Sequence, residues 1–237
     1  MKDRVEIEAE FDKLIRSMGA VVLRETLSKS PPFDNADYHF PAQQVVAELK
    51  CLKENKLDDP AFANKVDACW RKWRERGLVT GETPELMRSD SIPRECFGDI
   101  RRIYSATLRD RIKKANKQIR ETKAHLDLSD HQGLLLLAND ADLAIPPDSL
   151  FRLVLEILHG SCSEIDEVVL FTANLLSKVP TTDVPCYLWL IGTVPGRQAI
   201  NPRFSQELGV RWKACHEQLM GRKCKSFGGF IPQRIYI

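Results

Sequence analysis

The chain has 237 residues, of which 43% are hydrophobic and 29% charged, and its formal net charge is +2. This composition excludes an intrinsically disordered protein, because a chain of this length and hydrophobicity can bury a full core. The small net charge also means that nucleic-acid binding would need a local basic patch. We expect a single α/β domain over residues 1–237, with a helical insertion at 53–97.

The seven cysteines include no Cys-x-x-Cys pair and show no regular spacing. An odd number of scattered cysteines favours reduced thiols and predicts no zinc site. The first residues contain no apolar signal-peptide segment, and no apolar run approaches the ~20 residues that a membrane span needs. We therefore expect a soluble, cytoplasmic protein that does not act on membranes.

Residues 4–18 carry apolar side chains at helical spacing and are followed by Gly19, which predicts an amphipathic helix. Glu10 lies beside the apolar stripe of this helix, although a solvated position is the commoner role of such a glutamate. Residues 20–24 are typical of a short strand, and residues 28–35, with two consecutive prolines, are typical of a loop.

Residues 37–40 and 45–51 are rich in β-formers and flank a four-residue interruption, which predicts a β-hairpin. If Phe40 pairs with Val45, then Asp37 lies opposite Glu48, and Lys50 points to the same face. Two carboxylates beside an ammonium suit Mg²⁺ or Mn²⁺ and a phosphate-bearing substrate. The same letters also arise from ordinary surface charge pairs on a strand.

Residues 53–97 follow the hairpin as the expected insertion. A helix is predicted to start at Asp59-Pro60 and to end near Arg76, before Gly77. Its cluster at 71–76 mixes cations with Trp73 and could grip a nucleic-acid strand. Burial of the tryptophans beneath solvated arginines is the favoured interpretation. Residues 77–97 are expected to form a mobile loop.

A long helix is predicted over residues 99–126, where apolar residues form one stripe and basic residues dominate the other faces. We expect phosphate contacts on one basic row of this helix, formed by Arg109, Lys113, Lys117 and Arg120. A solvated helix can have the same composition, so this row supports nucleic-acid binding only in combination with the hairpin.

The second half of the chain alternates strand and helix. Strands are predicted at 133–138, 167–172 and 186–191, and helices from Pro146-Pro147 to about His159 and after Asn201-Pro202. Asp140 and Asp142 follow the first of these strands and could bind an ion, but turn chemistry explains them as well and is favoured. The order of elements predicts a mixed central sheet flanked by helices.

The hairpin, with Asp37 on its first strand and Glu48-Leu49-Lys50 on its second, resembles the PD-(D/E)xK restriction-endonuclease-like superfamily. That resemblance implies a core of helix, three strands, helix and strand, with Asp37 and Glu48 binding Mg²⁺ and Lys50 near the attacking water. It also implies that Gln118 borders the active site and that Glu10 can reach the metal. Ala36 replaces the proline of the first half-motif, so Asp34, in Pro32-Phe33-Asp34, is a rival for the first ligand.

Three functions remain open from the sequence. The first is a Mg²⁺- or Mn²⁺-dependent nuclease, a hydrolase of phosphodiester bonds with DNA as the expected substrate, which could act as a homodimer. The second is a catalytically inactive nuclease-like module that binds nucleic acid or a partner protein. The third is a scaffold in which the charges of the hairpin form ordinary pairs. The chain has no Gly-rich phosphate loop and no Gly-x-Ser-x-Gly elbow, which argues against a P-loop ATPase or an α/β-hydrolase.

Overall fold

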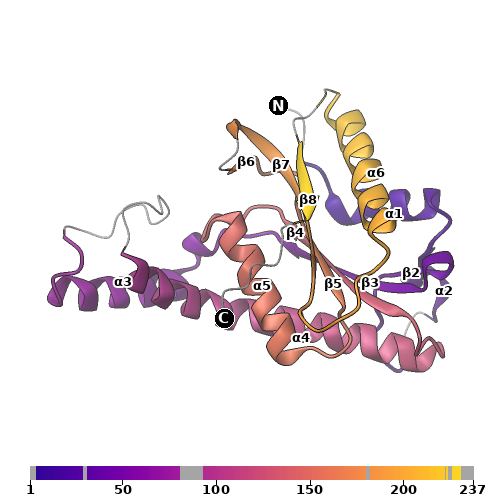
Figure 1. Cartoon of the computed structure of the whole chain (residues 1–237), viewed down its shortest axis with the longest axis horizontal. Helices are drawn as coiled ribbons and strands as arrows, with labels where there is room; N and C mark the ends of the chain where they lie inside the picture. Colours follow the sequence, from indigo (N-terminus) through magenta and orange to yellow (C-terminus); the bar gives the residue numbers. More distant parts are fainter. Residues whose placement is uncertain are drawn as a thin grey trace.

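A computed structural model of the chain describes residues 4–28, 31–80, 93–179, 182–221, 223 and 226–230. It is an α/β structure in which helices cover both faces of one mixed sheet (Figure 1). The helices are α1 (Ile7–Ser17), α2 (Leu23–Thr26), α3 (Pro60–Glu75), α4 (Arg94–His125), α5 (Pro147–Ser161) and α6 (Pro202–Met220), with 3-10 turns η1 (Pro41–Gln43) and η2 (Lys56–Asp58). The mixed sheet flanked by helices was expected from the sequence.

Eight strands within the described residues form the sheet. They are β1 (Val21–Val22), β2 (Tyr38–Phe40), β3 (Val45–Leu52), β4 (Gln132–Asn139), β5 (Glu167–Thr172), β6 (Ser177–Val179), β7 (Thr182–Thr193) and β8 (Ser226–Phe230). Their order is β1-β2-β3-β4-β5-β7-β6, and β8 also pairs with β7. The central strands β3, β4 and β5 run parallel, whereas β2 runs antiparallel to both of its neighbours, β1 and β3.

The central strands are buried on both faces, as parallel strands between two helical layers should be. In β4, Leu135 and Leu137 pack in the cluster formed with α3, α4 and α5, while Leu134 and Leu136 pack in the cluster formed with α1 and α6. Figure 1 shows α1 and α6 on the opposite side of the sheet from α4 and α5. Burying each leucine contributes roughly 1.5–3 kcal/mol, so this strand anchors both layers.

Several helix boundaries follow from local chemistry. The side chain of Asp59 caps α3 by accepting a hydrogen bond from the Ala61 N–H at 2.9 Å, and Asn201 caps α6 in the same way through Arg203 at 3.1 Å. A proline follows each cap in the first turn, where its missing N–H costs nothing. At its other end α6 stops at Gly221, which has a φ of 60°.

The segment after β3 forms η2 and α3, and α3 packs along α4. Trp70 and Trp73 are buried, and the indole N–H of Trp73 donates to Asp99 at 3.0 Å. The interpretation that these tryptophans belong to the core is therefore confirmed. Of the expected mobile loop, residues 81–92 lie outside the described residues, and α4 starts at Arg94 instead of near 99. None of the described helices is both long enough and apolar enough to cross a bilayer.

Candidate active site

The hairpin register puts Asp37 and Glu48 on one face. Phe40 pairs with Val45 and Tyr38 with Ala47, so Asp37, one residue before β2, lies across from Glu48 in β3. The Asp37 carboxylate accepts a hydrogen bond from the Leu49 N–H at 2.9 Å through Oδ2. The even-numbered residues of β3 face α4, so Glu48 and Lys50 lie between the sheet and this helix. The register expected from the sequence is confirmed.

Glu48 is an acid whose burial favours its protonated form. Only 1% of the residue is exposed, and burial raises the pKa of its carboxyl to about 8, with the charge of Asp37 adding to the effect and Lys50 opposing it. Burial also raises the pKa of Asp37, against the opposing effects of the Leu49 N–H and Lys50. With its pKa near 8, Glu48 keeps its proton near neutral pH, and the charge of Asp37 adds to the preference for that form.

The two oxygens of Glu48 have different surroundings. Lys50 Nζ donates to Oε1. Oε2 is buried, and among the described residues it receives no N–H or O–H hydrogen bond. Burying a charged carboxylate oxygen without a donor is costly, which agrees with the raised pKa of Glu48. Glu48 Oε2 is therefore the atom of the site that most clearly lacks an ordinary structural role.

Helix α4 covers the side chains of Glu48 and Lys50, which face it from β3. The ammonium of Lys50 donates to Gln118 Oε1 at 2.8 Å, and Gln118 Nε2 donates to the Asn35 carbonyl at 2.9 Å. One turn later, Thr122 Oγ1 accepts a hydrogen bond from the Ala36 N–H at 2.7 Å. Gln118 thus faces inward and fixes both Lys50 and the segment that leads into Asp37.

Asp34, the rival for the first ligand, lies at the surface. Its carboxylate pairs with Lys117 at 2.9 Å, its side chain is 51% exposed, and its backbone N–H donates to Glu121 at 3.1 Å. The hydrogen bond from Lys117 lowers the pKa of Asp34 below its usual value, with smaller contributions from Lys114 and Lys50. The geometry pairs Asp37, and not Asp34, with Glu48.

Glu10 does not join this group of residues. It accepts a hydrogen bond from Lys13 at 2.7 Å on α1, and its charge helps to raise the pKa of Cys215 on α6. Helices α1 and α6 cover the face of the sheet opposite Glu48. The predicted approach of Glu10 to the carboxylate pair is therefore not present.

The predicted basic row on α4 is exposed but mostly turned away from the carboxylate pair. At about 100° per residue, the members of this row lie between about 100° and 180° around the helix from Gln118. They are Arg109, Lys113, Lys117 and Arg120. Their binding of nucleic acid stays a prediction. Arg111 and Lys114 lie only about 20° and 40° around the helix from Gln118. Their spacing of seven and four residues from Gln118 was the pattern in the sequence that could have placed them on its side of the helix.

Two carboxylates are available to a divalent cation. Glu48 Oε2 receives no hydrogen-bond donor, and Asp37 is committed through Oδ2 alone in the described structure. Mg²⁺ is commonly held by one or two carboxylates together with waters and substrate phosphates, so this donor set fits it. No group of three or more His, Cys, Asp or Glu side chains suited to a metal occurs in the described residues. A cation here would therefore depend on oxygens from outside the chain.

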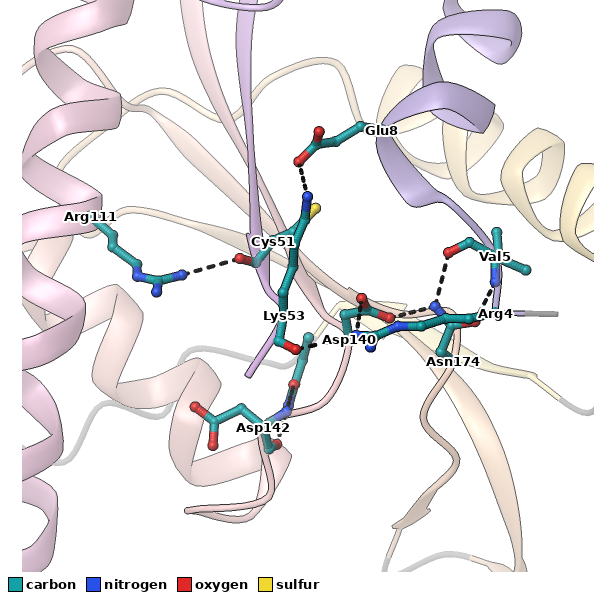
Figure 2. Close-up of polar contacts among 10 residues, drawn as sticks. Arg4, Val5, Glu8, Cys51, Lys53, Arg111, Asp140, Asp142 and Asn174 are labelled. Carbon is teal, nitrogen blue, oxygen red and sulfur yellow. Dashed lines mark hydrogen bonds and ion pairs between the residues drawn. The ribbon is translucent and has the colours of Figure 1, made fainter. Parts of the chain in front are cut away.

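A second polar group lies where the parallel strands end, and it is closed by its own partners (Figure 2). Asp140 accepts hydrogen bonds from Arg4 and Asn174, and Lys53 pairs with Glu8 at 2.9 Å. Asp142 accepts backbone N–H groups from Lys56 and Ala144 through Oδ1 and the Tyr104 hydroxyl through Oδ2. The favoured interpretation as turn chemistry is confirmed for Asp142, whereas Asp140 binds side chains of distant segments.

Comparison of the chain with protein-family models, with curated proteins and with solved structures finds no match.

Proposed function

We propose that the protein is a Mg²⁺- or Mn²⁺-dependent nuclease that hydrolyses phosphodiester bonds, with DNA as the expected substrate. One observation carries the proposal: Asp37, Glu48 and Lys50 converge under α4 and leave Glu48 Oε2 buried without a donor. In a buried acid pair of this kind, a cation can take the place of the proton on the protonated carboxyl group. An ordinary surface charge pair would be solvated and would not show so strong a pKa shift.

The order of elements adds support. Helix α1, strands β1 to β3, helix α4 and strand β4 follow one another as helix, three strands, helix and strand, with α2 and α3 as additions. This is the order that the resemblance to PD-(D/E)xK nucleases implies. By that resemblance, the corresponding residues of this chain are Asp37, Glu48, Lys50 and Gln118.

The roles of the residues follow from their contacts. Asp37 and Glu48 would hold the cation, which when bound would supply positive charge to a phosphate. Lys50 is held by Gln118 and Glu48, so its ammonium is oriented before substrate arrives and can stabilise charge on the phosphate or position a water. Gln118 acts through Lys50 and is a positioning residue.

A cleavage assay with matched variants tests the proposal. Plasmid, linear duplex, single-stranded DNA and RNA would be incubated with Mg²⁺ or Mn²⁺, with a chelator as control. We expect Asp37→Asn and Glu48→Gln to abolish cleavage, since each removes a carboxylate. Lys50→Met should lower the rate by about 10²–10³, the usual effect of losing a preorganised electrostatic group. Asp34→Asn and Lys53→Met are the matched surface controls and should cleave as wild type does.

Two outcomes would contradict the nuclease. One is a wild type that cuts none of these substrates, and the other is cleavage that persists in chelator and in all three site variants. In either case a catalytically inactive module that binds nucleic acid or a partner protein would be the better account. Loss of activity in Asp34→Asn with full activity in Asp37→Asn would instead move the first ligand to Asp34.

A further inference from the structure

Two histidines meet on the face of the sheet that carries α4. His39 lies in β2 and His131 directly before β4, and the centres of their rings are 5.1 Å apart. Tyr38 and Phe40 pack on the α1 side of the sheet, so by alternation His39 lies on the other face. Strand β3 separates β2 from β4, which places the backbones of these two strands about 10 Å apart. The two side chains therefore lean toward each other across β3.

One ring nitrogen of His39 lacks a partner. Its Nε2 is buried, and no group in the described part of the chain forms a hydrogen bond with it. A neutral imidazole uses each ring nitrogen as either a donor or an acceptor, so a buried nitrogen without a partner is costly. A bound water or a metal ion at this nitrogen removes that cost.

The ring of His131 is oriented by a carboxylate. Its Nδ1 lies 2.9 Å from Asp130 Oδ1, and an ionised carboxylate only accepts hydrogen bonds, so Nδ1 carries the proton. This hydrogen bond lowers the pKa of Asp130 below its ordinary value. The Gln44 amide donates to the other oxygen of Asp130 at 3.3 Å. Neutral His131 therefore keeps its lone pair on Nε2, and a carboxylate bound to the opposite ring nitrogen is the usual support of a metal-binding histidine.

We propose that His39 and His131 together bind one divalent transition-metal ion, with Zn²⁺ as the expected species. Imidazole nitrogens suit such ions, whereas Mg²⁺ prefers oxygen, so this site differs in chemistry from the pair Asp37 and Glu48. With Zn–N distances of about 2.0–2.1 Å and tetrahedral geometry, two rings on one zinc have centres about 5 Å apart, in agreement with the observed 5.1 Å. An ordinary ring contact permits the same separation, and the unpartnered Nε2 of His39 favours the ion.

The place of the pair in the fold indicates what the ion does. It joins β2 to the start of β4 across β3, and so holds the edge of the hairpin that carries Asp37. The chain supplies fewer ligands than a structural zinc site has, so waters complete the coordination. The ion acts on the stability of the fold, and the inference does not depend on the nuclease. The spacing of the histidines along the sequence gave no sign of the pair, because the fold brings them together from distant segments.

Nitrogen NMR of the histidine rings tests the site on the wild-type chain. Protein treated with chelator and then freed of it would be titrated with Zn²⁺ slightly above neutral pH, where imidazoles are uncharged. We expect the Nε2 signals of His39 and His131 to shift together and to reach a plateau at one zinc per chain. Mg²⁺ should leave both signals in place. The variants His39→Gln and His131→Gln assign the two signals, and each should weaken the zinc response of the ring that remains.

Two further variants sharpen the test. Asp130→Asn should weaken zinc binding about ten-fold or more, the usual effect of losing the carboxylate behind a metal-binding histidine. The Asp130 side chain is 67% exposed, so this variant keeps the fold even where a histidine variant does not. His125→Gln, which replaces an exposed histidine in the last turn of α4, is the matched control and should bind zinc as wild type does.

Thermal unfolding gives a second measurement. Zn²⁺ should raise the melting temperature of wild type and of His125→Gln, and should raise that of His131→Gln less, because the ion binds the folded pair. No zinc-dependent change at either ring, or a shift at one ring that the other does not share, overturns the site, and a water at His39 Nε2 is then the better account. A protein that binds zinc at this pair and cleaves nothing would retain the site and reject the nuclease.

Discussion

The proton that Glu48 holds links the site to the stability of the folded protein. In the folded state the pKa of Glu48 is about 8, against 4.5 for an unperturbed glutamate. Between these two values the folded protein binds more protons than the unfolded chain, so the free energy of unfolding falls as pH rises from about 4.5 to about 8. Ionising Glu48 thus destabilises the fold, since it places charge in a buried site beside Asp37.

We expect Glu48→Gln to remove this part of the pH dependence, because glutamine keeps the shape and cannot ionise. The variant should equal wild type near pH 5 and exceed it in melting temperature near pH 9. The measurement is thermal unfolding across that range. Glu54→Gln, an exposed glutamate on the same side of the sheet, is the control and should behave as wild type does. Parallel curves for wild type and Glu48→Gln would show that Glu48 ionises at an ordinary pH.

The same proton predicts how a cation would act on wild type. A metal must displace the proton to bind the two carboxylates, so stabilisation by Mn²⁺ should be larger near pH 9 than near pH 6. Glu48→Gln should show little stabilisation at either pH. A metal effect that is independent of pH would place the cation elsewhere on the chain.

At the residue scale, alternation along a strand was enough to find the acid pair. The period of two placed Asp37, Glu48 and Lys50 on one face, and the structure has them there. No local pattern in the sequence singled out Arg111 among the basic residues of its helix. Its position near Gln118 and β3 depends on how α4 is rotated against β3, and apolar periodicity fixes such a rotation too coarsely to select one arginine among its neighbours. The donor-free oxygen of Glu48 likewise depends on tertiary contacts that no local pattern contains.

At the scale of elements, a buried threonine of α4 helps to hold the loop before β2 in place, beside the contacts that Gln118 makes with Asn35 and Glu121 with Asp34. Thr122 is fully buried, and its hydroxyl accepts the Ala36 N–H. Thr122→Val keeps the shape but leaves that buried N–H without a partner, which should cost about 1–3 kcal/mol. Urea denaturation measures the loss, with Thr107→Val, a half-buried threonine of the same helix, as control. A cost no larger than that of the control would mean that Ala36 finds water or another acceptor.

The elements with strong periodicity were predicted well. Residues 167–172 form the strand expected there, the four leucines lie within β4, and the last helix begins after Asn201. The less accurate predictions concern elements whose pairing is decided by distant segments. Residues 20–24 contribute only Val21–Val22 to the sheet before α2 begins, and the short strands β6 and β8 were missed. Both β6 and β8 depend on β7 for their hydrogen bonds, so their own sequence carries little signal.

At the scale of the whole molecule, Asn174 joins the beginning of the chain to the end of β5 (Figure 2). Its amide accepts the Val5 N–H at 2.8 Å and donates to the Val5 carbonyl at 3.0 Å. It also donates to Asp140, which Arg4 pairs with from the other side. The segment before α1 is therefore fastened across the ends of β4 and β5.

We expect Asn174→Ala to release this segment without unfolding the sheet. Amide hydrogen exchange at Val5 and in the first turn of α1 should accelerate, while exchange in β4 should stay as in wild type, because local opening needs only these hydrogen bonds to break. Asn64→Ala, an exposed position on α3, is the control. Unchanged exchange at Val5 would show that packing of α1 alone holds the segment.

The fastening also sets an order of events during synthesis. Val5 and Asn174 are 169 residues apart, and α6, which packs against α1, starts only at Pro202. Helix α1 is made well before α6, so the side of Phe11 that packs against Trp212 stays uncovered while β3, α4 and β4 assemble from shorter separations. A nascent chain halted before Pro202 should expose this apolar face of α1 and be bound by chaperones. The full chain should cover the same face with α6.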